Sequence, residues 1–411
     1  MSAAACTDAE CAMLASIEAA GPAMIARAID WCAISSGSGN AAGLSAMLDL
    51  LQPAFAALPG TVERLPVRGA TTILTDGSET RGPNAEALRL TVRPDAPIQV
   101  VLTGHVDTVY PVGSGFERTV TRADGALNGP GIADMKGGLS VMLGALEAFE
   151  RHPVAARLGY RVLLSPDEEV GSPGSASLLA EIARGAQVGM TYEPALADGT
   201  LVSARKGTGN FHVVFRGRAA HAGRDFAAGR NAIAAAARLA GALDRINGTV
   251  EGVTVNVARI DGGGPLNVVP DMAVLRLNVR FPDRAAADAL ANAIDRCVAE
   301  TGGDGITVTL HGGFTRPAKP FDARQQALFG SVREVGALLG LSLAWQPTGG
   351  VCEGNNLHGA GLANVDTLGV RGGAIHSSEE HAWPESFIER AQLSALLLAK
   401  LATGEMTVPT A

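Results

Sequence analysis

The stretch that decides the fold is Ile98-Gln99-Val100-Val101-Leu102-Thr103-Gly104-His105-Val106-Asp107. Its first five residues form a short apolar run rich in β-branched side chains, which is typical of a buried strand. The run leads directly to His105, and Asp107 follows two residues later. Alternation along extended backbone puts both on one side, so Asp107 is placed to accept the second ring N–H of a metal-bound His105. The alternative is a surface histidine in a turn.

The same arrangement occurs twice more along the chain. Tyr160 to Leu164 is a second expected strand, and the pair Glu168-Glu169 follows it. Gln187 to Tyr192 is a third, and it ends on Glu193. Strands that carry polar residues at their exits and alternate with helices predict an open α/β sheet, with its site at the carboxyl edge of the strands.

Helices are expected between these strands and before them. Residues from about 10 to 32 and from 41 to 57 have apolar positions at helical spacing, as does Leu139 to Phe149. Asp134 lies in a glycine-rich approach to the last of these helices. Taken alone, a carboxylate there would be read as a helix N-cap.

The pattern changes between residues 206 and 313. Apolar and polar residues alternate over Phe211–Phe215 and Ala273–Phe281, which is typical of half-buried strands. Two helices are expected over 230–246 and 284–300, and two further strands over Val253–Ile260 and Ile306–Leu310. Together they complete the order β-α-β-β-α-β, which is ferredoxin-like. We therefore expect a discontinuous α/β domain, residues 1–205 and 314–411. An α+β domain at 206–313 interrupts it, and its strand edges suit dimerisation.

Side chains able to bind a metal gather at the ends of the apolar runs. Histidine and carboxylate ligands without thiolates suit a hard or borderline divalent metal, above all zinc. Their number is sufficient for two ions that share a bridging carboxylate, as in hydrolases that activate water between two metals. The set comprises His105, Asp107, Asp134, Glu168, Glu169, Glu193 and His376.

Composition narrows the choice of partners and location. The 411 residues are 47% hydrophobic and 18% charged, with a net charge of -8. No basic cluster suited to phosphates occurs, which argues against nucleic acid as a partner. The N-terminus lacks the basic start of a secretory signal, and no uninterrupted apolar stretch approaches the roughly 18 residues that span a bilayer, so no membrane is expected. Five scattered cysteines are read as free thiols in a reducing cytoplasm.

Four segments carry a resemblance to a known family. They are Gly104-His105-Val106-Asp107-Thr108-Val109, Asp134-Met135-Lys136-Gly137-Gly138, Asp167-Glu168-Glu169-Val170-Gly171-Ser172 and Ala220-His221-Ala222-Gly223. In this order they resemble the M20 zinc-peptidase family, and within it the glutamate carboxypeptidase branch. The resemblance covers most of the chain, from about residue 100 to 380. It implies an open mixed-sheet catalytic domain with two zinc ions per subunit, and a ferredoxin-like domain through which two subunits form a homodimer.

The resemblance also assigns roles to single residues. The implied zinc ligands are His105, Asp134, Glu169, Glu193 and His376. Asp134 would bridge the ions, Asp107 would support His105, and Glu168 would be the general base and acid. His221 would stabilise the oxyanion in the partner subunit's active site. Arg316, with Asn267 and Arg280 in support, would bind the substrate's carboxylate. His381 is an alternative to His376 as a zinc ligand, and Arg371 is an alternative to these arginines as the carboxylate-binding residue.

The implied activity is hydrolysis of an amide next to a C-terminal amino acid, in a short peptide or N-acyl amino acid, by water activated between two zinc ions. The first alternative is an N-acyl or N-succinyl amino acid deacylase, which would share every metal ligand. The second is a non-catalytic metal-binding protein, against which the intact Glu168 argues. Glu353 stands where the branch carries Asp, with Cys352 beside it, so the choice of substrate stays open.

Overall fold

The main sheet of the protein has six strands in the order β1-β4-β8-β5-β9-β18. The computed structural model describes residues 6–406. Strand β5 runs parallel to both of its neighbours, β8 and β9, and β18 runs parallel to β9. The pairs β1–β4 and β4–β8 are antiparallel. The expected open mixed sheet is therefore confirmed. Its strands are β1 (Thr61–Val67), β4 (Ala85–Val92), β5 (Ile98–His105), β8 (Leu158–Ser165), β9 (Val188–Thr191) and β18 (Asn364–Val365).

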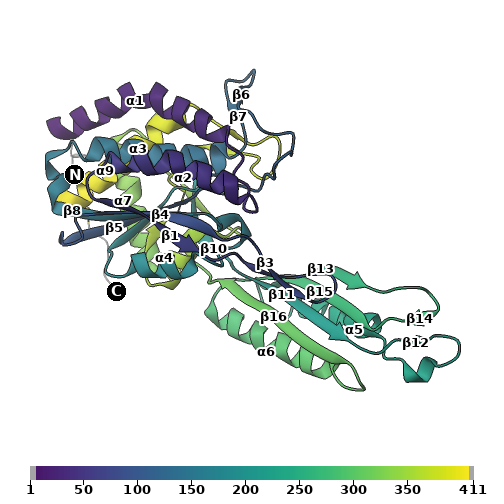
Figure 1. Cartoon of the computed structure of the whole chain (residues 1–411). Coiled ribbons are helices and arrows are strands. Elements are labelled where there is room, and N and C mark those ends of the chain that lie inside the picture. Colours follow the sequence, from purple (N-terminus) through teal and green to yellow (C-terminus); the bar gives the residue numbers. More distant parts are fainter. Residues whose placement is uncertain (1–5, 407–411) are drawn as a thin grey trace.

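Helices cover both faces of this sheet (Figure 1). Val100 and Leu102 of β5 pack into the larger core, whereas Val101 between them packs into a smaller core on the other face. The larger core includes α1 (Asp8–Cys32), α2 (Ala41–Ala56), α3 (Gly137–Phe149), α7 (Ala323–Leu338) and α9 (Glu385–Thr403). The smaller one includes α4 (Ala176–Ala183) and α8 (Glu353–Gly359). Burial on both sides explains why β5 reads as a continuous apolar run.

Helix α1 is long and apolar enough to cross a membrane by length and composition, and is the one such helix among the described residues. This is weak evidence for a membrane span. Met13, Ile17, Met24, Ala28 and Trp31 recur at helical spacing and are buried in the larger core.

A second sheet has the order β13-β15-β11-β16, and all its pairs are antiparallel. Its strands are β11 (Gly207–Arg216), β13 (Thr254–Gly262), β15 (Met272–Phe281) and β16 (Thr307–Arg316). Phe211, Val213 and Phe215 of β11 share a core with α5 (Ala232–Asp244) and α6 (Arg284–Thr301), as the alternation predicts. The succession β11-α5-β13-β15-α6-β16 is the expected ferredoxin-like one.

The two segments that connect the main unit to the second sheet lie side by side. Arg205 of the outgoing segment and Lys319 of the returning one exchange both backbone hydrogen bonds at 2.9 Å. Here β10 (Leu201–Arg205) also pairs with β17 (Trp345–Thr348). The second sheet extends away from the main unit, and the short pair β12 (Ala220–His221) and β14 (Val268–Val269) lies at its far tip (Figure 1). The domain boundaries themselves stay a prediction.

Two small sheets complete the fold. The hairpin β2 (Thr71–Ile73) and β3 (Glu79–Arg81) reaches the second sheet, where Ile73 is buried with Val214 and Val274. A four-stranded sheet has the order β19-β20-β7-β6 and holds the loop that carries His376. Its strands are β6 (Val120–Thr121), β7 (Leu127–Asn128), β19 (Gly372–Gly373) and β20 (His381–Ala382).

Candidate metal centre

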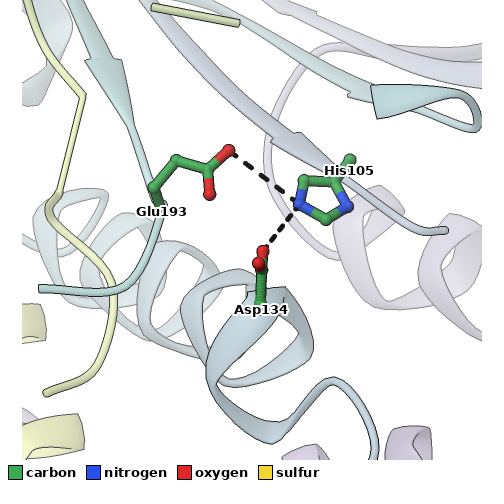
Figure 2. Close-up of side chains that lie close together, drawn as sticks. All are labelled: His105, Asp134 and Glu193. Atoms are coloured by element: carbon green, nitrogen blue, oxygen red, sulfur yellow. Dashed lines mark hydrogen bonds and ion pairs between the residues drawn. The ribbon is translucent and has the colours of Figure 1, made fainter. Parts of the chain in front are cut away.

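His105, the last residue of β5, points its ring toward two carboxylates. Its Nε2 lies 3.0 Å from Asp134 Oδ1 and 3.9 Å from Glu193 Oε1 (Figure 2). Its Nδ1 lies 2.9 Å from the backbone carbonyl of Asp107, which accepts a hydrogen bond. A carbonyl does not donate, so Nδ1 carries a proton, and Nε2 is the ring nitrogen that faces the carboxylates. This is the tautomer that a metal-binding histidine needs.

Asp134 lies between two histidines. Its Oδ1 faces His105, and its Oδ2 lies 3.4 Å from Nε2 of His376. The loop that carries it is held by Glu380, whose carboxylate accepts hydrogen bonds from the backbone N–H groups of Gly131, Ala133 and Asp134 at 2.9–3.0 Å. One carboxylate with an oxygen toward each histidine is the arrangement of a bridging ligand.

The ligand atoms fall into two groups that share Asp134. The first consists of His105, Asp134 and Glu193, and the second of Asp134, Glu169 and His376; within each, one atom per residue lies within 4.8 Å of the others. In the second group, Glu169 Oε2 lies 3.3 Å from His376 Nε2. His376 holds a left-handed backbone with φ of 64°, which is uncommon for a residue other than glycine and is often found at functional sites. All five expected ligands are thus brought together.

The residues of both groups fit a pair of divalent cations. Glu169 Oε1 and Glu193 Oε1 are buried and have no hydrogen-bond partner within residues 6–406. Burial raises the pKa of Glu193 well above its usual value, and repulsion from Asp134 and Glu168 adds to this. Burial also raises the pKa of Glu169 to about 7. Crowded, buried carboxylates are unfavourable without positive charge, and histidine and carboxylate donors together suit zinc.

Asp107 lies behind the site, not in it. Its carboxylate accepts hydrogen bonds from the backbone N–H groups of Glu168 and Glu169, both at 3.1 Å, and from Ser38 Oγ at 2.7 Å. The nearer contact of His105 is to the carbonyl of Asp107; its carboxylate lies 3.4 Å from Nδ1. Asp107 therefore fixes the histidine ring and the turn that carries both glutamates.

Glu168 is paired with Arg316, which is only 2% exposed. Arg316 Nη1 lies 2.6 Å from Glu168 Oε1, and Nη2 donates to the Glu168 carbonyl at 2.9 Å and to Ser172 Oγ at 2.8 Å. Burial lowers the pKa of Arg316, but the nearby acidic groups, with Glu168 the strongest of them, together outweigh burial and raise that pKa. In this conformation the guanidinium is occupied by Glu168. The role of Arg316 in binding substrate stays a prediction.

A cleft of about 580 Å³ opens onto the candidate ligands. Asp134, Glu168, Glu169, Glu193 and His376 line it, and the second sheet contributes Asn210, Asn278, Arg280 and Arg316. Arg280 Nε donates to Asn278 Oδ1 at 3.1 Å, while its Nη1 is buried and has no hydrogen-bond partner in the described chain. Burial lowers the pKa of Arg280, and the charge of Arg316 adds to this. A residue that lines the cleft thus has an unpaired hydrogen-bond donor.

His221 and Asn267 lie elsewhere, at the tip of the second sheet. The two are neighbours, because Ala222 N donates to the Asn267 carbonyl at 2.8 Å. Both side chains are exposed, and neither lines the cleft of its own chain. His221 Nδ1 accepts a hydrogen bond from Gly223 N at 3.1 Å, so its Nε2 is the donor in the neutral ring.

The competing residues are engaged with other groups. His381 Nδ1 lies 3.0 Å from the Glu379 carbonyl, and its ring packs edge-on against Trp383. Arg371 pairs with Glu385 and Glu389 at 2.9 and 3.3 Å. Neither residue lines the cleft.

Glu353 and Cys352 are buried behind the site. Burial raises the pKa of Glu353 to about 8, against a hydrogen bond from Ser165 that lowers it. Cys352 Sγ lies 3.6 Å from Asp366, which also pairs with Arg205 and Lys319 at 2.7 and 2.8 Å. Of this cluster, Arg205 reaches the cleft.

Sequence reasoning did not identify three supporting residues. Glu380 holds the Asp134 loop, Ser38 donates to Asp107, and Ser172 accepts a hydrogen bond from Arg316. Glu380 lies four residues after His376 in the same motif, and its place among charged surface-type residues gave no sign that it is fully buried. Ser38 lies in a serine- and glycine-rich break between two helices. Its composition indicates only a loop.

Three comparisons place the chain among known proteins. The model of the family described as "Peptidase family M20/M25/M40" matches residues 101–400. Carboxypeptidase G2 of Pseudomonas sp. (strain RS-16) is 27% identical over 381 residues, which are 90% of this chain and 88% of that protein. Succinyl-diaminopimelate desuccinylase of Verminephrobacter eiseniae (strain EF01-2) is 28% identical over 69% of this chain and 73% of its own. The crystal structure of a tripeptidase from Staphylococcus aureus superposes with a TM-score of 0.71 at 22% identity, covering 93% of this chain and 99% of that one.

Proposed function

The chain belongs to peptidase family M20/M25/M40, and from that premise we propose that it cleaves an amide bond next to a free C-terminal amino acid. Metal-dependent hydrolysis is common to the family. The finer assignment rests on Arg280, which lines the same cleft as the candidate ligands and whose Nη1 has no hydrogen-bond partner among the described residues. A guanidinium suits a terminal carboxylate in charge and geometry. We assign this contact to Arg280 because Arg316 is engaged by Glu168.

We propose that His105, Asp134, Glu169, Glu193 and His376 hold two zinc ions. Bound there, the ions supply Lewis acidity, which polarises the scissile carbonyl and lowers the pKa of water. Glu168 takes a proton from the attacking water and delivers it to the leaving amine. Arg316 and Asp107 keep Glu168 in place. Arg316 pairs with the Glu168 carboxylate, and Asp107 accepts a hydrogen bond from the Glu168 backbone N–H.

We further propose that residues 206–313 form a dimerisation domain, whose tip brings His221 and Asn267 to the partner's cleft. The exposure of both side chains, and the place of β12, which carries His221, at the tip far from the main unit (Figure 1), support an intermolecular role. A donor aimed at the developing oxyanion contributes on the order of 3 kcal/mol in comparable enzymes.

A panel of purified substrates tests the reaction. We expect the zinc-loaded protein to hydrolyse N-acyl amino acids with a free carboxylate on the amine side and to reject their carboxamides. Glu168→Gln should lower turnover by about 10²–10⁴-fold while zinc stays bound. A variant that kept more than about a tenth of wild-type turnover would contradict the assignment of the base.

The second candidate, a deacylase, is favoured by the similarity to succinyl-diaminopimelate desuccinylase. It predicts that a carboxylate on the acyl side is required instead. Absence of turnover with both substrate sets would contradict both candidates.

Subunit mixing tests the role of His221. His221→Ala and Glu168→Ala are each expected to be nearly inactive. In a mixed dimer, one cleft combines an intact Glu168 with the partner's intact histidine. Random exchange makes about half of the dimers mixed, each with one complete site, so activity should recover to roughly a quarter of wild type. No recovery in subunits shown to exchange would mean that His221 acts in its own chain or has no role.

A further inference from the structure

Glu380 connects the two loops that carry Asp134 and His376. Its carboxylate accepts hydrogen bonds from the backbone N–H groups of Gly131, Ala133 and Asp134. The side chain is fully buried, although it lies only four residues after His376. Hydrogen bonds to a charged acceptor are roughly twice as strong as those between neutral groups. Glu380 therefore ties the backbone of one candidate ligand firmly to the loop of another.

The loop around His376 is held through the backbone of Glu380. Glu380 N donates to the Ser377 carbonyl at 3.1 Å, which closes the turn after His376. The Glu380 carbonyl accepts hydrogen bonds from Gly129 N at 3.3 Å and from Asn128 Nδ2 at 2.7 Å. The His376 side chain is 53% exposed, so packing alone does not fix its ring. Its position depends on the loop, and the loop depends on Glu380.

The two ligand groups depend on these contacts to different degrees. In the first group, His105 ends β5 and Glu193 follows β9, so both are placed by strands of the main sheet. In the second group, Asp134 and His376 both lie on loops that Glu380 joins. Without Glu380, the first group keeps its two strand-end ligands in place. The second group loses the fixed relation between the ligands of its two loops.

We infer that Glu380 is a positioning residue for zinc, which sets the affinity of the second ligand group and leaves that of the first almost unchanged. The inference rests on the pair of zinc ions in the proposed function. Residues that orient metal ligands typically contribute about 10–100-fold to metal affinity. Glu380→Gln keeps the size of the side chain. Its amide NH₂ group, however, would face a backbone N–H that now donates to the carboxylate, and two donors cannot pair.

Zinc binding by chains that keep one ligand group measures the two groups separately. Glu193→Gln removes a ligand of the first group, and His376→Ala removes one of the second, so each variant should hold a single ion. In the Glu193→Gln chain, adding Glu380→Gln should weaken zinc binding by about 10–100-fold. In the His376→Ala chain, the same addition should change the affinity by less than about threefold, as for independent sites. Competition with a chelator gives the affinities, and native mass spectrometry counts the ions.

Glu379→Gln is the matched control, because Glu379 is the preceding residue but its side chain is exposed and pairs with Arg122 at 3.2 Å. It should leave both affinities unchanged. Tyr110→Phe decides the question if Glu380→Gln does not fold. Tyr110 Oη donates to the Ser377 carbonyl at 2.8 Å and so supports the same loop from another side. Its loss should weaken the second group by about twofold to tenfold, the contribution of one neutral hydrogen bond, and spare the first.

Equal losses of affinity in the two chains would overturn the inference, because Glu380 would then act through the shared Asp134 alone. Unchanged affinity in both would overturn it as well. In the otherwise unaltered chain, excess zinc should restore the turnover that Glu380→Gln loses, and a loss that zinc does not reverse would show a role in the reaction itself. Two bound ions without turnover of any amide would contradict the proposed reaction and leave the role of Glu380 standing. Turnover together with equal effects on both ligand groups would refute the role of Glu380 alone.

Discussion

The two sheets of this protein bury their strands in different ways. In the main sheet, Val101 and Leu102 are consecutive residues of β5, and both are fully buried, one toward each helical layer. In the second sheet, Val255 of β13 is buried while Asn256 beside it is exposed. The central strands of a sheet covered on both faces are largely apolar, and the candidate ligands lie where such strands end. The other face of the second sheet is covered only where the β2–β3 hairpin buries Val214 and Val274, so its edge strand β13 can carry polar groups on an open surface.

The largest expected effect concerns the strand-end site of the main sheet. Asp134→Asn removes the charge that both ligand groups share. Bound zinc should fall from about two ions per chain toward none, and kcat/KM by roughly 10³-fold or more, because several kcal/mol of charge stabilisation are lost. Metal analysis and steady-state kinetics measure both quantities. Asp95→Asn, at an exposed turn, should change neither, and full zinc content in Asp134→Asn would refute its bridging role.

Double-sided burial in β5 predicts large losses of stability at two consecutive positions. Leu102→Ala should reduce the free energy of unfolding by about 2–5 kcal/mol, and Val101→Ala by roughly 1–4 kcal/mol, since each leaves a cavity in a different core. Denaturant unfolding of the metal-free chains gives these values. If one of the two substitutions were neutral, the corresponding face of the sheet would not be packed as described.

The same contrast explains which features the sequence could predict. The strands ending at His105, Glu168-Glu169 and Glu193 were identified because parallel strands with both faces covered read as continuous apolar runs. The α+β order of residues 206–313 was identified because one-sided burial produces alternation. Strands β1 and β4 were not predicted. Polar residues such as Glu63 and Arg64 interrupt the pattern of β1, and its pairing with β4 is set by the completed sheet.

Within the site, sequence pattern and resemblance gave the ligand residues but not their supports. Each ligand follows a strand or opens a helix, which pattern reveals. The burial of Glu380 beneath the Asp134 loop and the pairing of Arg316 with Glu168 depend on how distant loops meet. No local period encodes such contacts, so a buried acid and a surface acid look alike in sequence.

Two acids, Glu353 at the start of α8 and Asp261 in β13, should give stability profiles of opposite slope. Burial raises the pKa of Glu353 to about 8, so the folded chain holds a proton that the unfolded chain releases near pH 4.5. Wild-type stability should therefore fall between about pH 4.5 and 8 relative to Glu353→Gln, by roughly 2–4 kcal/mol. Thermal or denaturant unfolding across this range measures the difference. An unchanged difference would mean that Glu353 titrates normally.

Asp261, in the second sheet, supplies the opposite sign. Burial would raise its pKa, but Arg276 and Arg259 lower it below the usual value. Its contribution to stability is therefore present above about pH 4 and is lost as the pH falls further. Asp261→Asn should lose stability at neutral pH and approach the wild type in acid. A gap that persisted at low pH would show that charge is not the cause.

The smallest expected effect tests the one-sided burial of the second sheet. Val255→Ala should cost about 1–3 kcal/mol, because Val255 packs in the core beneath α5. Asn256→Ala, one position along β13, should change the free energy of unfolding by no more than about 0.5 kcal/mol, since its side chain is exposed. The pair repeats the Val101 and Leu102 experiment in a sheet with one open face. If Asn256→Ala cost as much as Val255→Ala, the open face of β13 would be covered in solution, as it would be if this edge strand met a second subunit.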